Sequence, residues 1–185
     1  DGLDLLKELG AIQNNSGATK LTKIGVDLSR LPIEPRFARM VLESRNHGVT
    51  REVMSIVAGL TVQDPRERPL EKRPQADLSH ARFTDPTSDF LSLLNLWNYL
   101  EEKQKELSSS AFRRMCKAEF LNYLRVREWQ DLTGQLTQLM QEQGYLLNTQ
   151  PAGYQAIHQA VLSGLLGQVG FKDSEADYLG PRQTR

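Results

Sequence analysis

The sequence predicts a mainly α-helical protein in which a small winged-helix domain with a β-hairpin is followed by a helical bundle. Three observations carry this prediction. Residues 21–39 contain two helix starts joined by a proline-stiffened link, residues 14–17 form a strong turn signal, and residues 88–166 show apolar side chains at helical spacing. The length of 185 residues, of which 25% are charged, suits one substantial core or two small ones.

The first part of the chain predicts a short helix and a hairpin. Leucines recur on one side of residues 3–9, and Gly10 follows as a left-handed helix cap. The turn signal Asn-Asn-Ser-Gly at 14–17 separates two short runs, residues 11–13 and 19–21, which we expect to pair as strands. Helix, hairpin and the helix that comes next suggest a winged-helix-like unit.

Three helix starts follow the hairpin. Thr22 is placed to cap a short helix. The segment Leu-Pro-Ile-Glu-Pro at 31–35 cannot be helical before its prolines, but Pro35 suits the first position of a helix that ends near Gly48. Thr50 then caps another helix. Its apolar residues recur at helical spacing: Val53, Ile56, Val57 and Leu60.

Residues 61–87 interrupt this pattern and predict a linker or extended loop. They hold several prolines and few large apolar residues. Their charges alternate in sign: Arg66, Glu67, Arg68, Glu71, Lys72 and Arg73. This alternation favours a solvated loop over a basic binding patch.

Four helices are expected beyond the loop. The first spans about residues 88–106 from a cap at Ser88 or Asp89, and it is apolar nearly all round, which indicates a place in the middle of a bundle. The other three are expected at residues 111–127, 128–143 and 152–166.

The predicted domains follow from these elements. We expect a winged-helix domain with two bridging helices at 1–60, the linker or loop at 61–87, the bundle at 88–170 and a C-terminal lead-in segment at 171–185, of which residues 178–185 have no fold of their own. Because the chain lacks an initiator methionine, we expect it to be a fragment whose N-terminal part is truncated.

A formal net charge of zero limits what the chain can bind alone. A domain that binds nucleic acid tightly usually has a basic excess, because phosphate neutralisation supplies most of the affinity. Any contact with nucleic acid is therefore expected to be local, modest or shared with other parts of a longer protein.

No catalytic or metal-binding pattern is present. The chain lacks the glycine-rich phosphate loop and the acidic box of nucleotide hydrolases, so no cofactor is expected in it. The single cysteine, Cys116, is interpreted as a small buried hydrophobe. The histidines His47, His80 and His158 are isolated, and His158 is expected to make a structural hydrogen bond.

The cellular location is predicted from features that the sequence lacks. No apolar run approaches the ~18 residues that span a bilayer, and no signal peptide is visible. A chain with one cysteine and no disulfide framework fits a reducing, cytoplasmic setting without membrane contact.

The predicted helix 111–127 carries the candidate site. At ~100° per residue, Arg114 and Arg125 lie about 20° apart on the face opposite the aromatic side chains, separated by roughly 16 Å along the axis. Lys117 lies near the same side, and Asn122 borders it. Such a row could bridge phosphates of a single strand and position it without reading its sequence. The alternative is an ordinary solvated helix face.

The order of several motifs resembles the helicase-associated region of DEAH-box RNA helicases, over nearly the whole chain. Motifs similar to the winged-helix domain lie at 5–12, 21–25 and 31–40. Motifs similar to the adjoining helical ratchet domain lie at 88–97, 116–121, 135–136 and 157–166. Pro-Arg-Glu-Arg-Pro at 65–69 and Arg-Val-Arg-Glu-Trp at 125–129 resemble the bacterial HrpA-like branch of that family.

The resemblance implies a non-catalytic accessory fragment of an ATP-dependent RNA helicase. Such a fragment forms part of the single-stranded RNA channel and couples motion of the ATPase core to unwinding and translocation. ATP and Mg²⁺ would bind the parent's RecA-like domains. The expected partners are these RecA-like domains, single-stranded RNA and a following OB-fold. Residues 178–180 resemble the segment that leads into that OB-fold. The parent is expected to be a monomer. Thr133 departs from the pattern, since many members have arginine there, and this argues against a backbone contact from the third bundle helix.

Two other functions compete with this interpretation. The chain could be a protein-interaction module, in which the winged helix or the loop at 61–87 docks a regulator or the ribosome. A winged-helix DNA-binding regulator is disfavoured, because its recognition helix at 23–28 is short and has one basic residue.

Overall fold

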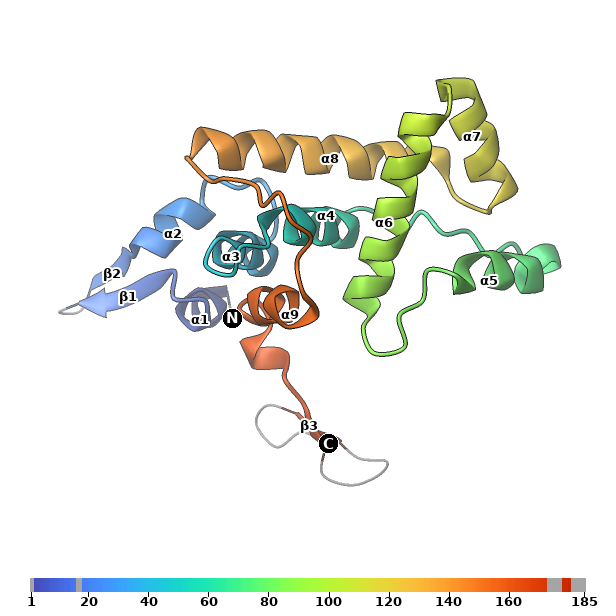
Figure 1. Ribbon diagram of the computed structural model, residues 1–185. Coiled ribbons are helices and arrows are strands. Elements are labelled where there is room, and N and C mark those ends of the chain that lie inside the picture. The colour runs from blue at the N-terminus through green and yellow to red at the C-terminus, as the bar shows by residue number, and fades with distance from the viewer. Residues whose placement is uncertain (1, 16–17, 173–177, 181–185) are drawn as a thin grey trace. The chain divides into compact units, whose positions relative to one another are not determined.

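The computed structural model describes residues 2–15, 18–172 and 178–180 of the chain. It is mainly helical, as predicted, and a hairpin near the N-terminus forms a small two-stranded sheet (Figure 1). The chain divides into two compact units. Unit 1 comprises Asp1–Val53 and Tyr145–Arg185, and unit 2 comprises Met54–Gly144.

Unit 1 begins with the predicted helix and hairpin. Helix α1 (Gly2–Glu8) ends before Gly10, whose φ of 70° is the left-handed conformation that glycine adopts at no cost. Strands β1 (Ile12–Asn15) and β2 (Ala18–Leu21) pair antiparallel, with Ile12 opposite Leu21. Turn residues 16 and 17 lie outside the described residues, but the strand pairing confirms the hairpin.

The next two helices start where the sequence predicts. The Thr22 hydroxyl accepts from the backbone N–H of Gly25 (3.1 Å) and caps α2 (Lys23–Leu28). It also donates to the carbonyl of Gly10 (2.6 Å) and so ties the helix to the end of α1. Pro35 is the first residue of α3 (Pro35–Ser44).

Helix α9 (Tyr154–Leu162) packs against α3 in unit 1. A Cβ on Gly164 would lie 2.4 Å from the carbonyl oxygen of Arg36, so only glycine permits this close approach. Nη1 of Arg36 in turn donates to the Gly164 carbonyl (3.2 Å). The sequence groups residues 152–166 with the bundle, whereas these contacts group the helix with unit 1.

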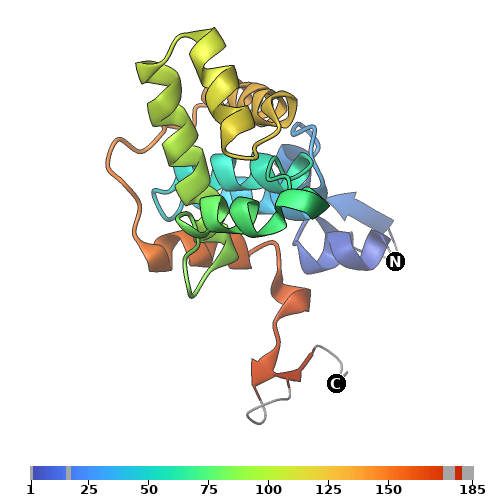
Figure 2. The same ribbon diagram turned by 90° about the vertical axis from the view of Figure 1, so that its right-hand side faces the viewer.

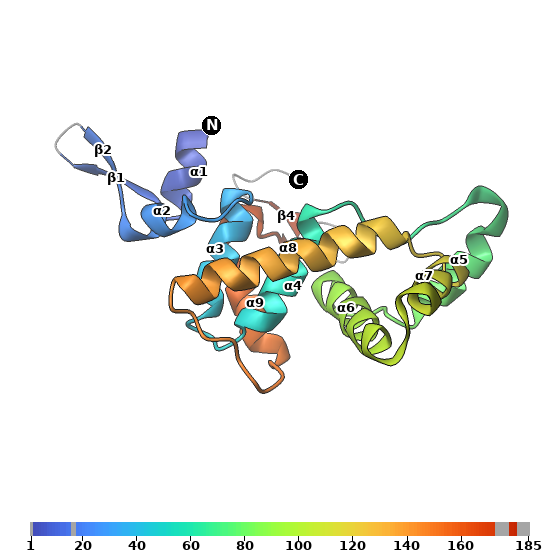
Figure 3. The same cartoon turned by 90° about the horizontal axis from the view of Figure 1, so that it is seen from above.

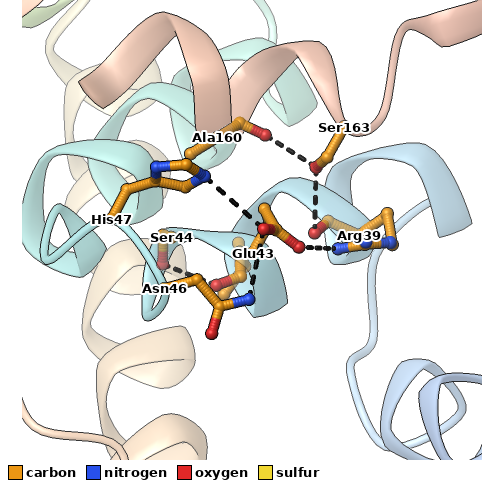
Figure 4. A network of polar contacts seen from close by, with 8 residues as sticks. Arg39, Glu43, Ser44, Asn46, His47, Ala160 and Ser163 are labelled. Atoms are coloured by element: carbon orange, nitrogen blue, oxygen red, sulfur yellow. Dashed lines mark hydrogen bonds and ion pairs between the residues drawn. The ribbon is translucent and has the colours of Figure 1, made fainter. Parts of the chain in front are cut away.

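A polar network at the end of α3 holds the Glu43 carboxylate (Figure 4). It accepts hydrogen bonds from Nη1 of Arg39 (2.7 Å) and Nδ2 of Asn46 (3.1 Å), and it lies 3.5 Å from Nε2 of His47. Burial alone would raise the pKa of Glu43, but these hydrogen bonds and charges outweigh it and lower the pKa. The Ser163 hydroxyl, beyond the end of α9, lies 3.4 Å from the Arg39 carbonyl.

Two short strands close the described part of unit 1. Strand β3 (Phe171–Lys172) pairs antiparallel with β4 (Tyr178–Leu179). The sequence predicts that residues 178–185 have no fold of their own, whereas residues 178 and 179 form β4 in this pairing. The remaining residues of that segment, 173–177 and 181–185, lie outside the described residues.

Unit 2 consists of the end of α4 (Thr50–Thr61), a 3₁₀ turn η1 (Leu70–Lys72) and helices α5 (Arg73–Ala81), α6 (Asp89–Glu106), α7 (Ser109–Ala118) and α8 (Tyr123–Glu142). Helix α7 folds back beside α6 (Figure 2 and Figure 3), and α6 crosses α8 (Figure 1). The core is centred on two indoles, Trp97 and Trp129, whose ring centroids lie 5.1 Å apart. Nε1 of Trp129 donates to the Ser55 carbonyl (2.7 Å).

The prediction of an extended loop at 61–87 is wrong for its second half, which contains η1 and α5. Composition concealed this helix because small or polar residues hold it in place. Ala76 is fully buried, and Nε2 of the buried His80 lies 3.1 Å from the carbonyl of Glu119. The prediction of solvated charge is confirmed for Arg68, Glu71, Lys72 and Arg73, which are exposed, whereas Arg66 and Glu67 are partly buried.

The prediction of one helix over 111–127 is also wrong, because α7 ends at Ala118 and α8 begins at Tyr123. The helix ends in a Schellman motif, in which Leu121 N–H bonds to the Cys116 carbonyl (2.8 Å) and Phe120 N–H to the Lys117 carbonyl (3.4 Å). Phe120 takes the left-handed position with a φ of 56°. This position usually holds glycine, so the sequence gives little sign of the break.

Of the helices in the described part of the chain, none is both long enough and apolar enough to cross a membrane.

Candidate nucleic-acid interface

Unit 2 contains an open groove of about 890 Å³. One wall is the segment 67–72, and the other is the junction between α7 and α8. This volume lies in the range of about 300–1,000 Å³ that is typical of small-molecule sites. The groove therefore has room for a ligand the size of a nucleotide.

Backbone pairing fixes the two walls to each other. The N–H of Glu67 donates to the Phe120 carbonyl (2.8 Å), and the N–H of Asn122 donates to the Pro65 carbonyl (2.7 Å). Arg66 and Leu121 form the antiparallel bridge between these two bonds. The segment that the sequence treats as a loop is thus joined to the α7–α8 junction by a short ladder.

Four cations line the groove: Lys72, Arg113, Arg114 and Lys117. The side chains of Arg114 and Lys117 are exposed, and with the described residues they form neither a hydrogen bond nor an ion pair. Arg113 lies over the Tyr123 ring, with its guanidinium carbon 5.7 Å from the ring centroid. Two carboxylates, Glu67 and Glu71, share the groove, so its charge is net positive.

Two neighbouring arginines are already neutralised and contribute little to this charge. Arg66 pairs with Asp64 through Nη2 and Oδ2 (2.7 Å), and Arg68 pairs with Asp77 through Nε and Oδ1 (2.6 Å). Burial would raise the pKa of Asp64, but the hydrogen bonds and charge of Arg66 hold it below its ordinary value. The cations available to a ligand are those on α7 and η1.

Asn122 lines the groove but uses both ends of its amide within the protein. Oδ1 accepts from the N–H of Leu124 (3.1 Å) and of Arg125 (3.2 Å), which caps α8. Nδ2 donates to Oε1 of Glu67 (2.8 Å), which is on the opposite wall. The structure gives Asn122 the role of holding the groove together.

Arg125 does not line the groove. Its Nη1 donates to the carbonyl of Asp64 (3.1 Å). The predicted row of cations on one continuous helix is therefore wrong, because the break at Phe120 puts Arg114 on α7 and Arg125 on α8. Arg114, Lys117 and Asn122 line one groove. Contact of these three residues and of Arg125 with nucleic acid stays a prediction.

Sequence reasoning missed the exposed leucines of the groove, Leu70 and Leu124, and two of its cations, Lys72 and Arg113. Leu70, Lys72 and Arg113 reach the groove because the ladder brings together segments about 50 residues apart. No local pattern announces that pairing. The one available signal was Leu70, a single large apolar residue between Pro69 and the charged residues at 71–73.

Three other predictions concern side chains outside the groove. Cys116 is fully buried, as predicted, and burial raises its pKa to about 11. Nδ1 of His158 lies 2.7 Å from the Tyr154 carbonyl, which confirms the structural hydrogen bond. Thr133 is buried and donates to the Trp129 carbonyl (2.9 Å), so it faces the core. No cluster of metal-ligating side chains occurs within residues 2–15, 18–172 and 178–180.

Comparison with known proteins identifies the class of this chain. Residues 34–121 match the family described as helicase associated domain (HA2), ratchet-like. The match includes Arg114 and Lys117 and ends one residue before Asn122. The chain thus contains the helicase-associated, ratchet-like domain.

Individual relatives narrow the class. The chain is 54% identical over 188 residues to ATP-dependent RNA helicase HrpA of Escherichia coli, and 50% identical over 189 residues to its homolog of Haemophilus influenzae. Each match covers 100% of this chain and 14% of the relative. The pre-mRNA-splicing factor ATP-dependent RNA helicase prp22 of Schizosaccharomyces pombe is 29% identical over 91% of this chain and 14% of the relative. Over its whole length the chain is therefore similar to one region of the HrpA helicases, and it spans about one seventh of the length of these relatives.

Proposed function

We propose that this chain is a non-catalytic accessory region of an ATP-dependent RNA helicase and forms part of its single-stranded RNA channel. One observation carries the proposal: Arg114 and Lys117 stand exposed and unpaired, within the described residues, beside an open groove. Unpaired cations at a groove are suited to phosphates, and phosphate contacts position a strand without reading its sequence.

The geometry limits how strong this binding is. Two free cations, with Lys72 and Arg113 nearby, neutralise few phosphates, and affinity for nucleic acid scales with that number. The chain therefore supplies a local grip within a larger binding surface. The relatives' names give ATP and RNA as what those proteins use.

The remaining parts of the proposal concern the parent protein. Its RecA-like domains bind ATP and Mg²⁺, and their motion against this region couples the state of the nucleotide to unwinding and translocation. A following OB-fold completes the channel, and the parent acts as a cytoplasmic monomer. The whole-chain similarity to two RNA helicases supports this assignment.

The salt dependence of RNA binding tests the site. The double variant R114A/K117A should bind a labelled single-stranded RNA more weakly than the wild type. The slope of log K against log salt should fall by about 0.7 for each lost phosphate contact. The control is Lys105→Ala, an exposed lysine of α6 outside the groove lining. An unchanged slope in the double variant contradicts the assignment.

A second experiment tests Arg125 together with Arg114. The variant R114A/R125A is made in a helicase that contains this region, and RNA affinity and unwinding rate are measured. Loss of both supports the residue assignment. Unchanged affinity and unwinding would reject these residues without affecting the fold.

A second candidate function, a protein-interaction module that docks a regulator or the ribosome, is favoured by a separate observation in unit 1. Tyr154 and Leu162 of α9 and Leu166 beyond it are exposed apolar side chains. A pull-down with the chain, compared with RNA binding across salt concentrations, separates the two. Steep salt dependence favours RNA, and salt-insensitive capture of a protein favours docking.

A further inference from the structure

The groove has an apolar side that phosphate binding does not use. Leu70 is 90% exposed and Leu124 is 70% exposed, and both line the groove. Phe120 and Tyr123 line it as well. A single exposed leucine needs no explanation, but two leucines and two aromatic residues beside four cations form a surface with two distinct halves.

We propose that this groove binds one unpaired nucleotide of a single strand, with its base against Leu70 and Leu124 and its phosphates at Arg114 and Lys117. The inference rests on the proposed function, since it takes the cations as a phosphate site. It adds that the grip includes the base. The region then distinguishes an unpaired strand from a duplex, whose bases are stacked inside and out of reach.

The chemistry of both halves favours a nucleotide over a peptide. The cations outnumber the carboxylates in the lining, so the groove attracts an anion. The Tyr123 ring and the Arg113 guanidinium, which lie 5.7 Å apart, offer planar groups of the kind on which bases stack. Leu70 and Leu124 can contact the apolar face of any of the bases, so the contact is independent of sequence.

The ladder beneath the groove makes this site persistent. The backbone N–H groups of Glu67 and Asn122 each donate to a carbonyl on the opposite wall. Nδ2 of Asn122 also donates to Oε1 of Glu67 (2.8 Å). Leu70 follows Glu67 by three residues and Leu124 follows Asn122 by two. Each leucine is therefore carried by a fixed part of the backbone, and the two remain on the same groove.

The test compares two single strands of equal length and charge, one of normal RNA and one made of abasic residues. The full 185-residue chain should bind the abasic strand about fivefold more weakly or worse, because the apolar contact of the base with Leu70 and Leu124 is lost. The double variant L70S/L124S should lose this discrimination while keeping the salt slope of the wild type. The control L78S removes a leucine of α5 that is 78% exposed and lies outside the groove.

Each outcome decides between the inference and the function on which it rests. Equal binding of both strands by the wild type overturns the base contact and leaves the phosphate site intact. An unchanged salt slope in R114A/K117A overturns the phosphate site itself. Stronger competition by an acidic, leucine-rich peptide than by single-stranded RNA assigns the groove to a protein partner. If L70S/L124S fails to fold, the single variant L70S, at the most exposed position, carries the same comparison.

Discussion

Gly59 of α4 lies directly against the indole of Trp129 on α8. A Cβ on Gly59 would be 2.7 Å from Cζ2 of Trp129 and 2.9 Å from Cδ2 of Leu93. Real Cβ atoms do not approach ring atoms this closely, so the absence of a side chain at residue 59 sets the spacing of these helices. The indole is also held from its polar end by the bond to Ser55.

Gly59→Ala should therefore destabilise unit 2 by about 1–3 kcal/mol through overpacking. The opposite sign would be expected from helix propensity, which favours alanine by ~1 kcal/mol. The matched control is Gly134→Ala on α8, where a Cβ would meet nothing within 4 Å. Urea unfolding should show Gly59→Ala less stable and Gly134→Ala as stable as the wild type or more so. Similar shifts in both variants would refute the contact.

Asn122→Ala should lower the free energy of unfolding by about 0.5–2 kcal/mol, because it removes the cap of α8. It also removes the bond to Glu67, so the groove should loosen and RNA affinity should fall in parallel. Gln135→Ala, an exposed position of the same helix, should stay within about 0.5 kcal/mol. Wild-type stability of Asn122→Ala would show that the cap is dispensable.

Glu43→Gln should reduce stability at neutral pH and not in acid. The pKa of Glu43 is lowered in the folded protein, so its stabilising effect is present above the ordinary glutamate pKa of about 4.3 and is lost as the pH falls through the folded value. The stability difference between variant and wild type, followed by urea unfolding over a pH series, should shrink below about pH 4. Glu128→Gln, an exposed carboxylate on α8, serves as the reference. A difference that does not change with pH would disprove the role of the charge.

Cys116 should resist alkylation in the folded protein. Its side chain is fully buried and its pKa is raised to about 11, so at pH 8 about one thousandth of it is thiolate. Labelling with iodoacetamide should be slow in buffer and fast in urea, which makes this single cysteine a probe of unfolding. Cys116→Ala gives the blank. Rapid labelling without denaturant would mean that α7 opens readily.

The sequence predicted what depends on neighbouring residues. Thr22, Pro35 and Ser88 mark helix starts through chemistry that acts within three residues, and all three are found where expected. Gly10 marks a helix end for the same reason. The fold class followed from such local signals and from the order of the motifs, and so did two of the four cations that line the groove, Arg114 and Lys117.

The prediction failed where distant contacts override local preference. Phe120 adopts a conformation that favours glycine, and backbone pairing with the segment at 65–67 stabilises it there. Helix α5 is held by the contact of His80 with the carbonyl of Glu119, 39 positions away, and by burial of Ala76, and composition shows neither. The groove forms because the segment at 65–67 pairs with the α7–α8 junction. The sequence could therefore suggest individual residues of the site but not that they lie together.

Helix α8 begins at the groove, because its first residues, Tyr123 and Leu124, line it. Its 20 residues, Tyr123–Glu142, extend about 30 Å at ~1.5 Å per residue. A strand bound as proposed would load the ladder bonds at the α7–α8 junction and the capped first turn of α8. A stiff rod delivers at Glu142 the displacement that it receives at Tyr123. The groove therefore lies at one end of a rigid helix, which would pass a movement at the groove on to residues about 30 Å away.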